Sequence, residues 1–233
     1  MSALWGVLPA AGSGSRFGAQ RPKQFLELQG RSLLDWSVSA LLDAVPLQGV
    51  VVAVAESEVR HFERSEVLAD SRVSFCAGGD SRARSVANGL AALPAESGDW
   101  VLVHDAARPC VPVEDIRHLV QSVTATGVGG LLACRVTDTL KRESNDARVA
   151  ETVDRKLLWR ALTPQMFPVG ALRDALNDAL EKGVELTDEA SAMERAGAPI
   201  QLVQASAVNI KVTYPEDLAL ASFWLERQSG EAA

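Results

Sequence analysis

The feature that most constrains the fold is a repeated alternation of short apolar runs with stretches of helical period. The apolar runs cover residues 4–8, 50–55, 73–77, 101–104 and 130–134. Apolar residues recur at helical spacing elsewhere, as in the segments 116–123 and 172–180. This alternation is typical of buried parallel strands joined by crossover helices. We therefore expect an α/β fold with a Rossmann-like, mostly parallel sheet flanked by helices.

Length and composition limit the number of domains and the kinds of partner. The chain of 233 residues is long enough for one sizeable α/β core, so we expect a single domain over residues 1–233. Its formal charge of -7 disfavours a nucleic-acid or anionic-membrane surface, since such binding depends on an excess of Lys and Arg. Three cysteines without C-x-x-C spacing indicate buried thiols in a reducing compartment rather than a disulfide framework.

The amino terminus passes from Met1 directly into the first apolar run, without a basic segment or a cleavage site. We see no signal or transit peptide in this pattern. No run has the length of a membrane-spanning helix. A cytoplasmic location is therefore the expectation.

Residues 135–156 do not follow the strand and helix alternation. Half of these residues are charged, and Ser144, Asn145 and Asp146 at the centre favour a turn. The segment predicts a protruding β-hairpin. Because an isolated two-stranded ribbon is at best marginally stable, we expect it to pack on a second copy of the chain as a dimerisation arm.

The chain is expected to end in a helix. The segment Thr213-Tyr214-Pro215-Glu216 has capping-box spacing with a proline in the first turn. The helix should continue through Leu218, Ala221 and Leu225.

A glycine-rich turn, Leu8-Pro-Ala-Ala-Gly-Ser-Gly-Ser-Arg-Phe17, follows the first predicted strand directly. Small residues there let backbone N–H groups approach a phosphate. The turn is not a Walker loop, and Phe17 stands where a dinucleotide fingerprint has its third glycine. A tight turn alone would account for Gly12 and Gly14. It would not account for the cations that follow.

Those cations are Arg16 and, in the element Pro22-Lys23-Gln24, Lys23. Positive charge beside a phosphate-binding turn is what attack on a nucleotide α-phosphate requires, because negative charge builds on the phosphoryl oxygens. Together the two elements resemble the nucleotidyltransferases that activate sugars and polyols. The Pro-Lys-Gln form resembles the 2-C-methyl-D-erythritol 4-phosphate cytidylyltransferase family.

A second motif, Gly78-Gly-Asp-Ser-Arg-x-x-Ser-Val-x-Asn-Gly-Leu90, follows the third strand and opens a helix. Taken alone it is a turn with Asp80 or Ser81 as helix cap. It is also similar to the segment with which this family surrounds cytosine and ribose. Gly79, Asp80 and Ser85 occupy the matching positions.

A third motif, Val103-His-Asp-Ala-Ala-Arg-Pro109, ends the fourth strand, where open α/β sheets bind their ligands. Asp105 could cap a turn, or it could contact a magnesium ion or substrate hydroxyls. Arg108 could meet the phosphate of a polyol. The motif matches the family.

Further matches extend the resemblance nearly to the carboxyl end. They contain Thr139, Arg155, Thr163, Thr187 and Lys211. Each has a structural alternative, such as hairpin surface charge or a helix cap, and Thr187-Asp-Glu is expected to cap a helix in any case. Lys211 is expected on a strand, just before a helix, where a cation suits phosphate.

The resemblance implies a Mg²⁺-dependent transfer from CTP to a polyol phosphate, with formation of 4-diphosphocytidyl-2-C-methyl-D-erythritol and pyrophosphate in isoprenoid precursor biosynthesis. Arg16, Lys23, Lys211 and Arg155 are the implied catalytic residues, with Arg155 reaching the site of a partner subunit. The implied CTP-binding residues are Pro9, Ala10, Ala11, Gly12, Gly14, Gly79, Asp80 and Ser85. The implied acceptor-binding residues are Asp105, Arg108, Thr139, Arg155, Thr163, Thr187 and Lys211.

Magnesium is expected to be held mainly by CTP, with Asp105 as the candidate protein ligand. Some relatives have an acidic residue directly before the Asn-x-Lys element, whereas Ala207 and Val208 stand there in this chain. A second protein ligand is therefore not predicted. The chain also lacks room for the cyclodiphosphate synthase domain that is fused to this activity in some organisms, so a single activity is expected.

Several other functions remain open at this level. A cytidylyltransferase for another polyol phosphate, such as ribitol 5-phosphate, would share most of these motifs. A catalytically inactive nucleotide-binding regulator is disfavoured because Arg16, Lys23, Asp105 and Lys211 are all present. A metal-dependent glycosyltransferase would need an Asp-x-Asp element, which the sequence lacks. A dehydrogenase would need the glycine fingerprint.

Overall fold

A computed structural model describes residues 2–12, 22–55, 58, 65, 67 and 69–231. Arg16 and Gly14, two of the predicted site residues, lie outside the described residues.

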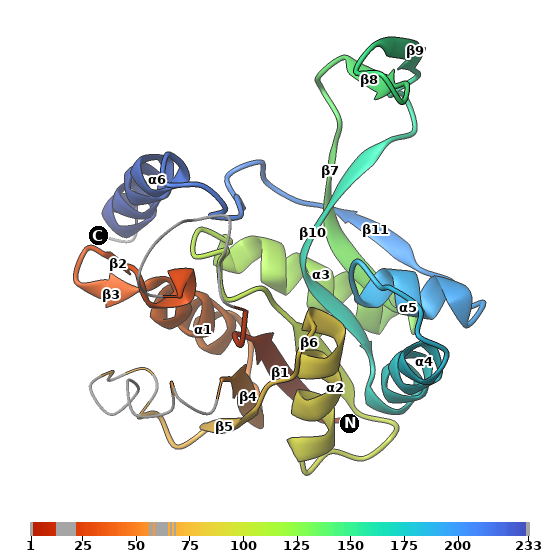
Figure 1. Cartoon of the computed structure of the whole chain (residues 1–233). Coiled ribbons are helices and arrows are strands. Elements are labelled where there is room, and N and C mark those ends of the chain that lie inside the picture. The colour runs from red at the N-terminus through yellow and green to blue at the C-terminus, as the bar shows by residue number, and fades with distance from the viewer. Residues whose placement is uncertain are drawn as a thin grey trace.

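The centre of the molecule is a seven-stranded sheet (Figure 1). Its strands in spatial order are β11 (Gln201–Gln204), β7 (Gly130–Arg135), β10 (Trp159–Pro168), β6 (Trp100–Val103), β1 (Leu4–Pro9), β4 (Gly49–Val54) and β5 (Val73–Ala77). Neighbouring strands are parallel except at β10, which runs antiparallel to both β6 and β7. The predicted α/β class with a mostly parallel sheet is confirmed.

Helices cover both faces of this sheet (Figure 1). The helices α1 (Leu33–Ala44) and α3 (Val113–Thr126) share one hydrophobic cluster with the sheet. A second cluster joins the other face to α2 (Arg82–Ala92), α4 (Val169–Glu181) and α5 (Glu189–Arg195). In β4, Val50, Val52 and Val54 belong to the first cluster and Val51 to the second, because successive side chains of a strand point to opposite faces. This double burial explains the continuous apolar runs in the sequence.

The carboxyl-terminal helix α6 (Asp217–Glu231) packs beside the start of α1 and the small hairpin of β2 (Glu27–Leu28) and β3 (Arg31–Ser32). The predicted helix is present, but its start differs from the expected capping box. The Asp217 carboxylate accepts hydrogen bonds from the backbone N–H groups of Thr213 and Tyr214. The Thr213 hydroxyl instead donates to the Lys211 carbonyl. Asp217 therefore accepts the Thr213 N–H hydrogen bond that the capping box assigned to Glu216.

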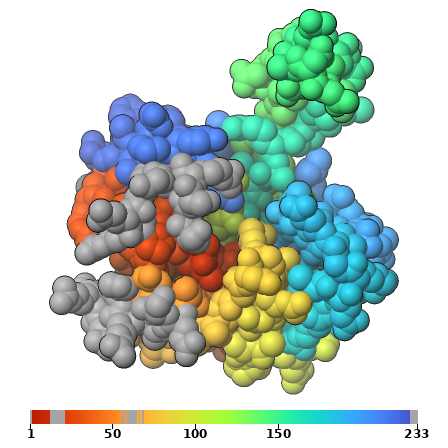
Figure 2. All heavy atoms as spheres, in the orientation of Figure 1, coloured from red at the N-terminus to blue at the C-terminus, as the bar shows by residue number. Residues whose placement is uncertain are grey.

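The charged segment 135–156 forms the predicted hairpin, with β8 (Leu140–Glu143) antiparallel to β9 (Val149–Val153). Figures 1 and 2 show this ribbon standing clear of the body of the molecule. Its apolar side chains include Val149, which is 63% exposed, and the neighbouring Leu157 is 87% exposed. The second subunit expected to cover the ribbon stays a prediction.

The placement of Lys211 differs from the sequence-based expectation. Residues 205–216 form a loop after β11, so Lys211 lies on a loop and not on a strand. The Leu162–Gln165 segment lies within β10, where the register shifts and the Thr163–Pro164 peptide is cis. The residues on either side of this shift, Ala161 and Gln165, pair with β7, and Gln165 also pairs with β6.

No helix in the described part of the chain is both long and apolar enough to cross a membrane. The parallel strands β1, β4, β5 and β6 end at one edge of the sheet. The glycine-rich turn after β1 and the motifs after β5 and β6 therefore meet at that edge, as parallel topology requires.

Candidate active site

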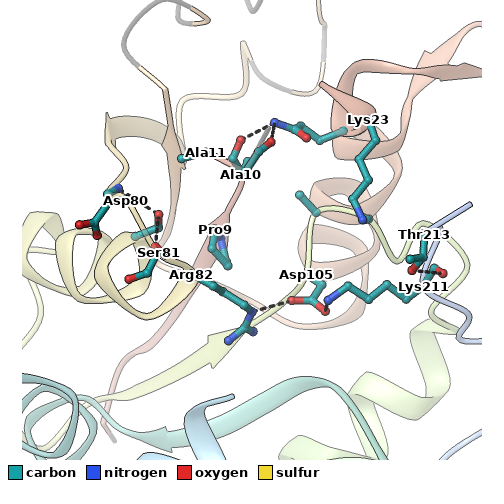
Figure 3. Close-up of a pocket in the computed structure, with 16 residues that line it drawn as sticks. Pro9, Ala10, Ala11, Lys23, Asp80, Ser81, Arg82, Asp105, Lys211 and Thr213 are labelled. Atoms are coloured by element: carbon teal, nitrogen blue, oxygen red, sulfur yellow. Dashed lines mark hydrogen bonds and ion pairs between the residues drawn. The ribbon is translucent and has the colours of Figure 1, made fainter. Parts of the chain in front are cut away.

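A cavity of about 540 Å³ lies at this edge (Figure 3). Its walls come from the turns after β1, β5 and β6, from the short 3₁₀ helix η2 (Lys23–Phe25) and from the loop before α6. The lining residues are Pro9, Ala10, Ala11, Gly12, Lys23, Gln24, Gly79, Asp80, Ser81, Arg82, Ser85, Asp105, Ala106, Ala107, Lys211 and Thr213. Every predicted CTP-binding residue that the structure describes lies in this wall.

The turn after β1 is fixed from both sides. The Ala10 N–H donates to the Ala53 carbonyl at 2.7 Å. The buried Gln24 side chain donates to the carbonyls of Ala10 and Gly12 at 2.6 and 3.2 Å. Gln24 thus joins the Pro-Lys-Gln element to the glycine-rich turn, which gives a physical reason for their pairing in the sequence.

The turn after β5 is held by serine hydroxyls at the start of α2. Ser81 is the helix N-cap and accepts from the Arg84 N–H. Ser85 donates to the Ser81 carbonyl at 2.9 Å and accepts from the Gly79 N–H at 3.0 Å. The hydroxyl of Ser85 therefore shapes the turn that forms one wall of the cavity.

Asp105 lies buried after β6 and is surrounded by three cations. One oxygen accepts from Arg82 Nε at 3.0 Å, and the other is 2.8 Å from Lys211 Nζ and 3.3 Å from Arg108 Nε. Burial by itself would raise the pKa of Asp105, but the charges of Arg82, Lys211 and Arg108 outweigh it and hold this pKa far below its ordinary value. Asp105 is therefore ionised at neutral pH.

A second cavity of about 220 Å³ adjoins the first and shares Arg82, Asp105 and Lys211 with it. Its other lining residues are Arg108, Ala161, Leu162, Thr163, Gln165, Thr187 and Asp188. Five of the predicted acceptor-binding residues lie here, namely Asp105, Arg108, Thr163, Thr187 and Lys211. The three shared residues form a common wall between two spaces of unequal size.

A chain of hydrogen bonds fixes the backbone of Asp105. His104 Nε2 lies 3.2 Å from the Arg108 carbonyl, which can only accept, so this nitrogen carries the proton. His104 Nδ1 then accepts from the Thr163 hydroxyl at 3.0 Å, and the same hydroxyl accepts from the Asp105 N–H at 3.0 Å. Burial lowers the pKa of His104 to about 4, so its ring is neutral at neutral pH. In this structure the hydroxyl of Thr163, a predicted acceptor-binding residue, therefore holds His104 and the backbone of Asp105.

Lys23 and Lys211 approach the large cavity from two different elements (Figure 3). Lys23 Nζ donates to the Val212 carbonyl at 2.9 Å, next to Lys211 in the chain. The Val212 N–H donates to the Ala107 carbonyl at 2.8 Å. The loop before α6 is therefore joined to both η2 and the turn after β6, and it brings the two lysines together.

Two of the predicted site residues that the structure describes lie in neither cavity. Thr139 and Arg155 are exposed residues at the base of the projecting ribbon. The Arg155 guanidinium donates to the Thr137 carbonyl across the ribbon. Within the single described chain, the structure does not bring them to the other site residues.

Sequence reasoning missed Arg82 and Glu189 as site residues. Arg82 Nη1 and Nη2 lie 2.6 and 3.0 Å from the two carboxylate oxygens of Glu189, which is 0% exposed. Both residues stand inside motifs that the sequence singles out, but motif similarity alone does not show which side chains are buried together. The one feature of the sequence that could have indicated this pair is the position of Arg82 and Glu189, each at the first residue of a helix.

The described residues do not form a metal site from protein groups alone. Among them, no group of three or more His, Cys, Asp or Glu side chains is placed to hold a metal ion. Both oxygens of Asp105 already contact cationic side chains. Direct metal ligation by Asp105 stays a prediction and would require the carboxylate to exchange one of these partners.

Comparisons with known proteins identify the family of this chain. The sequence profile of the 2-C-methyl-D-erythritol 4-phosphate cytidylyltransferase family matches residues 4–227. The chain is 47% identical over 230 residues to a protein of that name from Vibrio vulnificus, covering 98% of this chain and 97% of the relative. It is 49% identical over 221 residues to the protein of that name from Pseudomonas aeruginosa, covering 94% of each chain.

A solved structure of similar fold leads to the same family. The crystal structure of the Francisella tularensis protein of that name superposes with a TM-score of 0.82 at 33% identity, covering 96% of this chain and 100% of the other. The chain therefore belongs to the 2-C-methyl-D-erythritol 4-phosphate cytidylyltransferase family.

Proposed function

We propose that this chain transfers the cytidylyl group of CTP to the phosphate of 2-C-methyl-D-erythritol 4-phosphate and releases pyrophosphate. The observation that carries the proposal is the pair of adjoining cavities with a common wall of Arg82, Asp105 and Lys211. Transfer between two substrates needs two binding spaces whose reacting groups meet. The family assignment supports CTP in the larger space and the polyol phosphate in the smaller one.

The reaction forms a bond between an acceptor phosphate oxygen and the α-phosphorus of CTP. The bond from that phosphorus to the oxygen bridging the α- and β-phosphates breaks, and its electron pair leaves with pyrophosphate. The attacking phosphate is already ionised at neutral pH, so the step needs no general base. The neutral, buried His104 is consistent with this, because it is bonded to Thr163 and to the backbone.

Negative charge accumulates on the α-phosphoryl oxygens during the transfer, and fixed cations stabilise it. Lys23 and Lys211 line the larger cavity and are our candidates, together with Arg16. Arg108, held against Asp105 and the Asn209 carbonyl, is placed to bind the acceptor phosphate in the smaller cavity. The Asp105 carboxylate is a hydrogen-bond acceptor for the hydroxyls of the polyol.

We propose that CTP binds with Mg²⁺, which would neutralise phosphate charge when bound. The described protein residues do not supply a cage for this ion, so the triphosphate oxygens would be its main ligands. The turns at the cavity would fix the cytosine, with Ala10, Ala11, Gly79 and Asp80 as the selecting groups and Ser85 in support.

We also propose a homodimer in which the ribbon of one subunit crosses to the other. The exposed apolar side chains of Val149 and Leu157 suit an interface. Arg155 and Thr139, remote from both cavities in their own chain, would then reach the acceptor phosphate of the partner subunit. The cytoplasmic location and the lack of a nucleic-acid partner stay predictions from the sequence.

The test is pyrophosphate release with each of CTP, UTP, ATP and GTP, combined with 2-C-methyl-D-erythritol 4-phosphate or ribitol 5-phosphate as acceptor. We expect turnover with CTP and the methylerythritol phosphate, and very poor turnover with purine nucleotides, because a pocket of fixed hydrogen-bond partners rejects a base that leaves them unpaired. Comparable rates with ATP or GTP would refute the cytosine assignment. Preference for ribitol 5-phosphate would refute the acceptor assignment.

A further inference from the structure

Arg82 and Glu189 form a partly buried ion pair that none of the roles above uses. Glu189 is 0% exposed, although an ionised carboxylate is costly to remove from water without a partner. Both of its oxygens accept from the fork of Arg82, at 2.6 and 3.0 Å. Burial lowers the pKa of Arg82, but Glu189 and Asp105 raise it further, so the guanidinium stays charged. Such a bidentate pair fixes direction as well as charge.

The same guanidinium also contacts the catalytic edge. Its third nitrogen, Nε, donates to one oxygen of Asp105 at 3.0 Å. Arg82 is the first residue of α2, Asp105 follows β6, and Glu189 begins α5. One planar side chain therefore joins three segments at the wall that separates the two cavities (Figure 3 shows the bond to Asp105).

The charges around Asp105 are unevenly divided between its two oxygens. Lys211 and Arg108 both contact the second oxygen, at 2.8 and 3.3 Å, whereas Arg82 alone contacts the first. Lys211 and Arg108 are the cations that the proposed function gives to phosphate groups. When they turn toward phosphates, Asp105 loses two of its three cationic partners.

We infer that Arg82 is a positioning residue, aimed by Glu189, that keeps the Asp105 carboxylate in place while Lys211 and Arg108 engage phosphate. This inference rests on the proposed function. Arg82 can serve in this way because Nη1 and Nη2 both donate to the buried Glu189 carboxylate. These two bonds keep the guanidinium in place when a substrate phosphate binds nearby. Glu189 thereby acts on the reaction through two intervening side chains.

Two conservative variants test the inference. Arg82→Ala is less suitable, because it would leave the buried Glu189 carboxylate without its cationic partner. Arg82→Lys keeps the positive charge and loses the fork, and Glu189→Gln keeps the shape and loses the negative charge. Arg173→Lys on α4 and Glu194→Gln on the exposed face of α5 are matched controls for the same chemical changes.

We expect each variant to lower kcat/KM for the acceptor by roughly tenfold to a hundredfold, since displacement of a substrate-orienting group commonly has effects of that order. The Kd for CTP alone, by calorimetry, should change by less than about threefold, because the Arg82 guanidinium in the cavity wall is bonded to Asp105 and Glu189, and none of the predicted CTP-binding residues is altered. The kcat/KM of the Arg82→Lys/Glu189→Gln double variant should be no lower than that of the less active single variant, because both changes remove the same Arg82–Glu189 interaction. The controls should keep the kinetics of the parent.

Other outcomes refute the inference. One is a lowered melting temperature with unchanged kcat/KM for the acceptor, which indicates a purely structural ion pair. Another is an equal loss for CTP binding and acceptor use, which indicates general distortion of the site. Multiplicative losses in the double variant would show two independent effects. If the parent itself releases no pyrophosphate from CTP and the acceptor, the proposed function fails instead, so the two failures are distinguishable.

Discussion

A methyl group added to Gly78 tests how closely the two turns of the nucleotide cavity must approach. Gly78 follows β5 and packs against Ala11, which follows β1. A Cβ atom on Gly78 would lie 2.2 Å from the Cβ of Ala11. The same atom would be 3.2 Å from Ser85 Oγ and 3.4 Å from the Val54 carbonyl oxygen, contacts that small shifts can relieve. The conflict in Gly78→Ala is therefore essentially with one methyl group.

The size of the effect follows from the packing. Carbon atoms in contact are normally about 3.5–4.0 Å apart, so the turns would have to separate by more than about 1 Å. Hydrogen bonds of 2.7 Å hold both turns to β4, from the Gly78 N–H to Val54 and from the Ala10 N–H to Ala53. We expect a loss of about 1–3 kcal/mol in the free energy of unfolding, the usual cost of overpacking. CTP should also bind more weakly, because Ala11 lines the cavity.

Removing the opposing methyl group provides the decisive comparison. Ala11→Gly should cost less than about 1 kcal/mol, mainly through greater freedom of the unfolded chain. In the Ala11→Gly/Gly78→Ala variant the clash disappears, so the double variant should be more stable than the sum of the single effects by about 1 kcal/mol or more. The recovery should appear in CTP affinity as well.

The assays are urea unfolding for stability and calorimetric titration for CTP. Gly98→Ala is the matched control, since a Cβ atom there meets nothing within 4 Å, and its stability should be unchanged or slightly increased. Strictly additive single effects would refute the reasoning, as would a Gly78→Ala protein with the stability and CTP affinity of the parent. Either result would mean that the turns have room to move apart.

Three further predictions concern charge and assembly. Lys23→Ala should lower kcat roughly a hundredfold to a thousandfold with a smaller change in CTP affinity, and Arg16→Ala should do the same, because a cation that stabilises developing charge acts on turnover. The free energy of unfolding should fall by on the order of 3 kcal/mol as pH drops from 6.5 to about 4, since the unfolded chain protonates His104 in this window and the folded chain does not; His104→Gln should remove this part of the pH dependence in urea unfolding. Mixing Lys23→Ala and Arg155→Ala proteins under subunit exchange should restore pyrophosphate release, because one site of each mixed dimer then has both residues intact.

Each of these predictions has a control and a contradictory result. Lys182→Ala removes an exposed lysine at the end of α4 and should keep kcat; weaker CTP binding with full turnover in Lys23→Ala would contradict a transition-state role. His118→Gln removes an exposed histidine and should keep the pH dependence, whereas an unchanged slope in His104→Gln would refute the account of the buried ring. Verified mixed dimers that remain inactive would place Arg155 in its own subunit's site or outside the chemistry.

The sequence allowed much of the fold to be predicted because double burial leaves a clear pattern. The five apolar runs are strands of the sheet, and the segments 116–123 and 172–180 lie in α3 and α4. The strand β11 escaped prediction because it has only four residues, with glutamine at both ends and only two apolar residues between them. The start of α6 differed because the side chain of Asp217, the residue directly after the predicted segment 213–216, accepts from the backbone N–H groups of Thr213 and Tyr214.

The candidate site was predictable where backbone turns form it and less so where side chains meet through the fold. Ala10, Gly79 and Asp105 stand in motifs directly after strands, so parallel topology alone brings them together. The link from Arg82 to Glu189 joins residues that are 107 positions apart, and no local pattern marks it. Arg155 is a different case. It was predicted from the sequence, but its proposed role is in the site of a partner subunit, so a single chain does not bring it to the other site residues.

The most direct test of the account follows the label from CTP carrying ³²P at its α-phosphorus, incubated with the parent protein, Mg²⁺ and 2-C-methyl-D-erythritol 4-phosphate. The proposed attack on the α-phosphorus predicts that all consumed label appears in the cytidine diphosphate-linked polyol, with one unlabelled pyrophosphate released for each product. Label recovered as CMP would mean hydrolysis in place of transfer. Label left in CTP, with the folded protein and both substrates present, would contradict the assignment of the two adjoining cavities as a cytidylyl-transfer site.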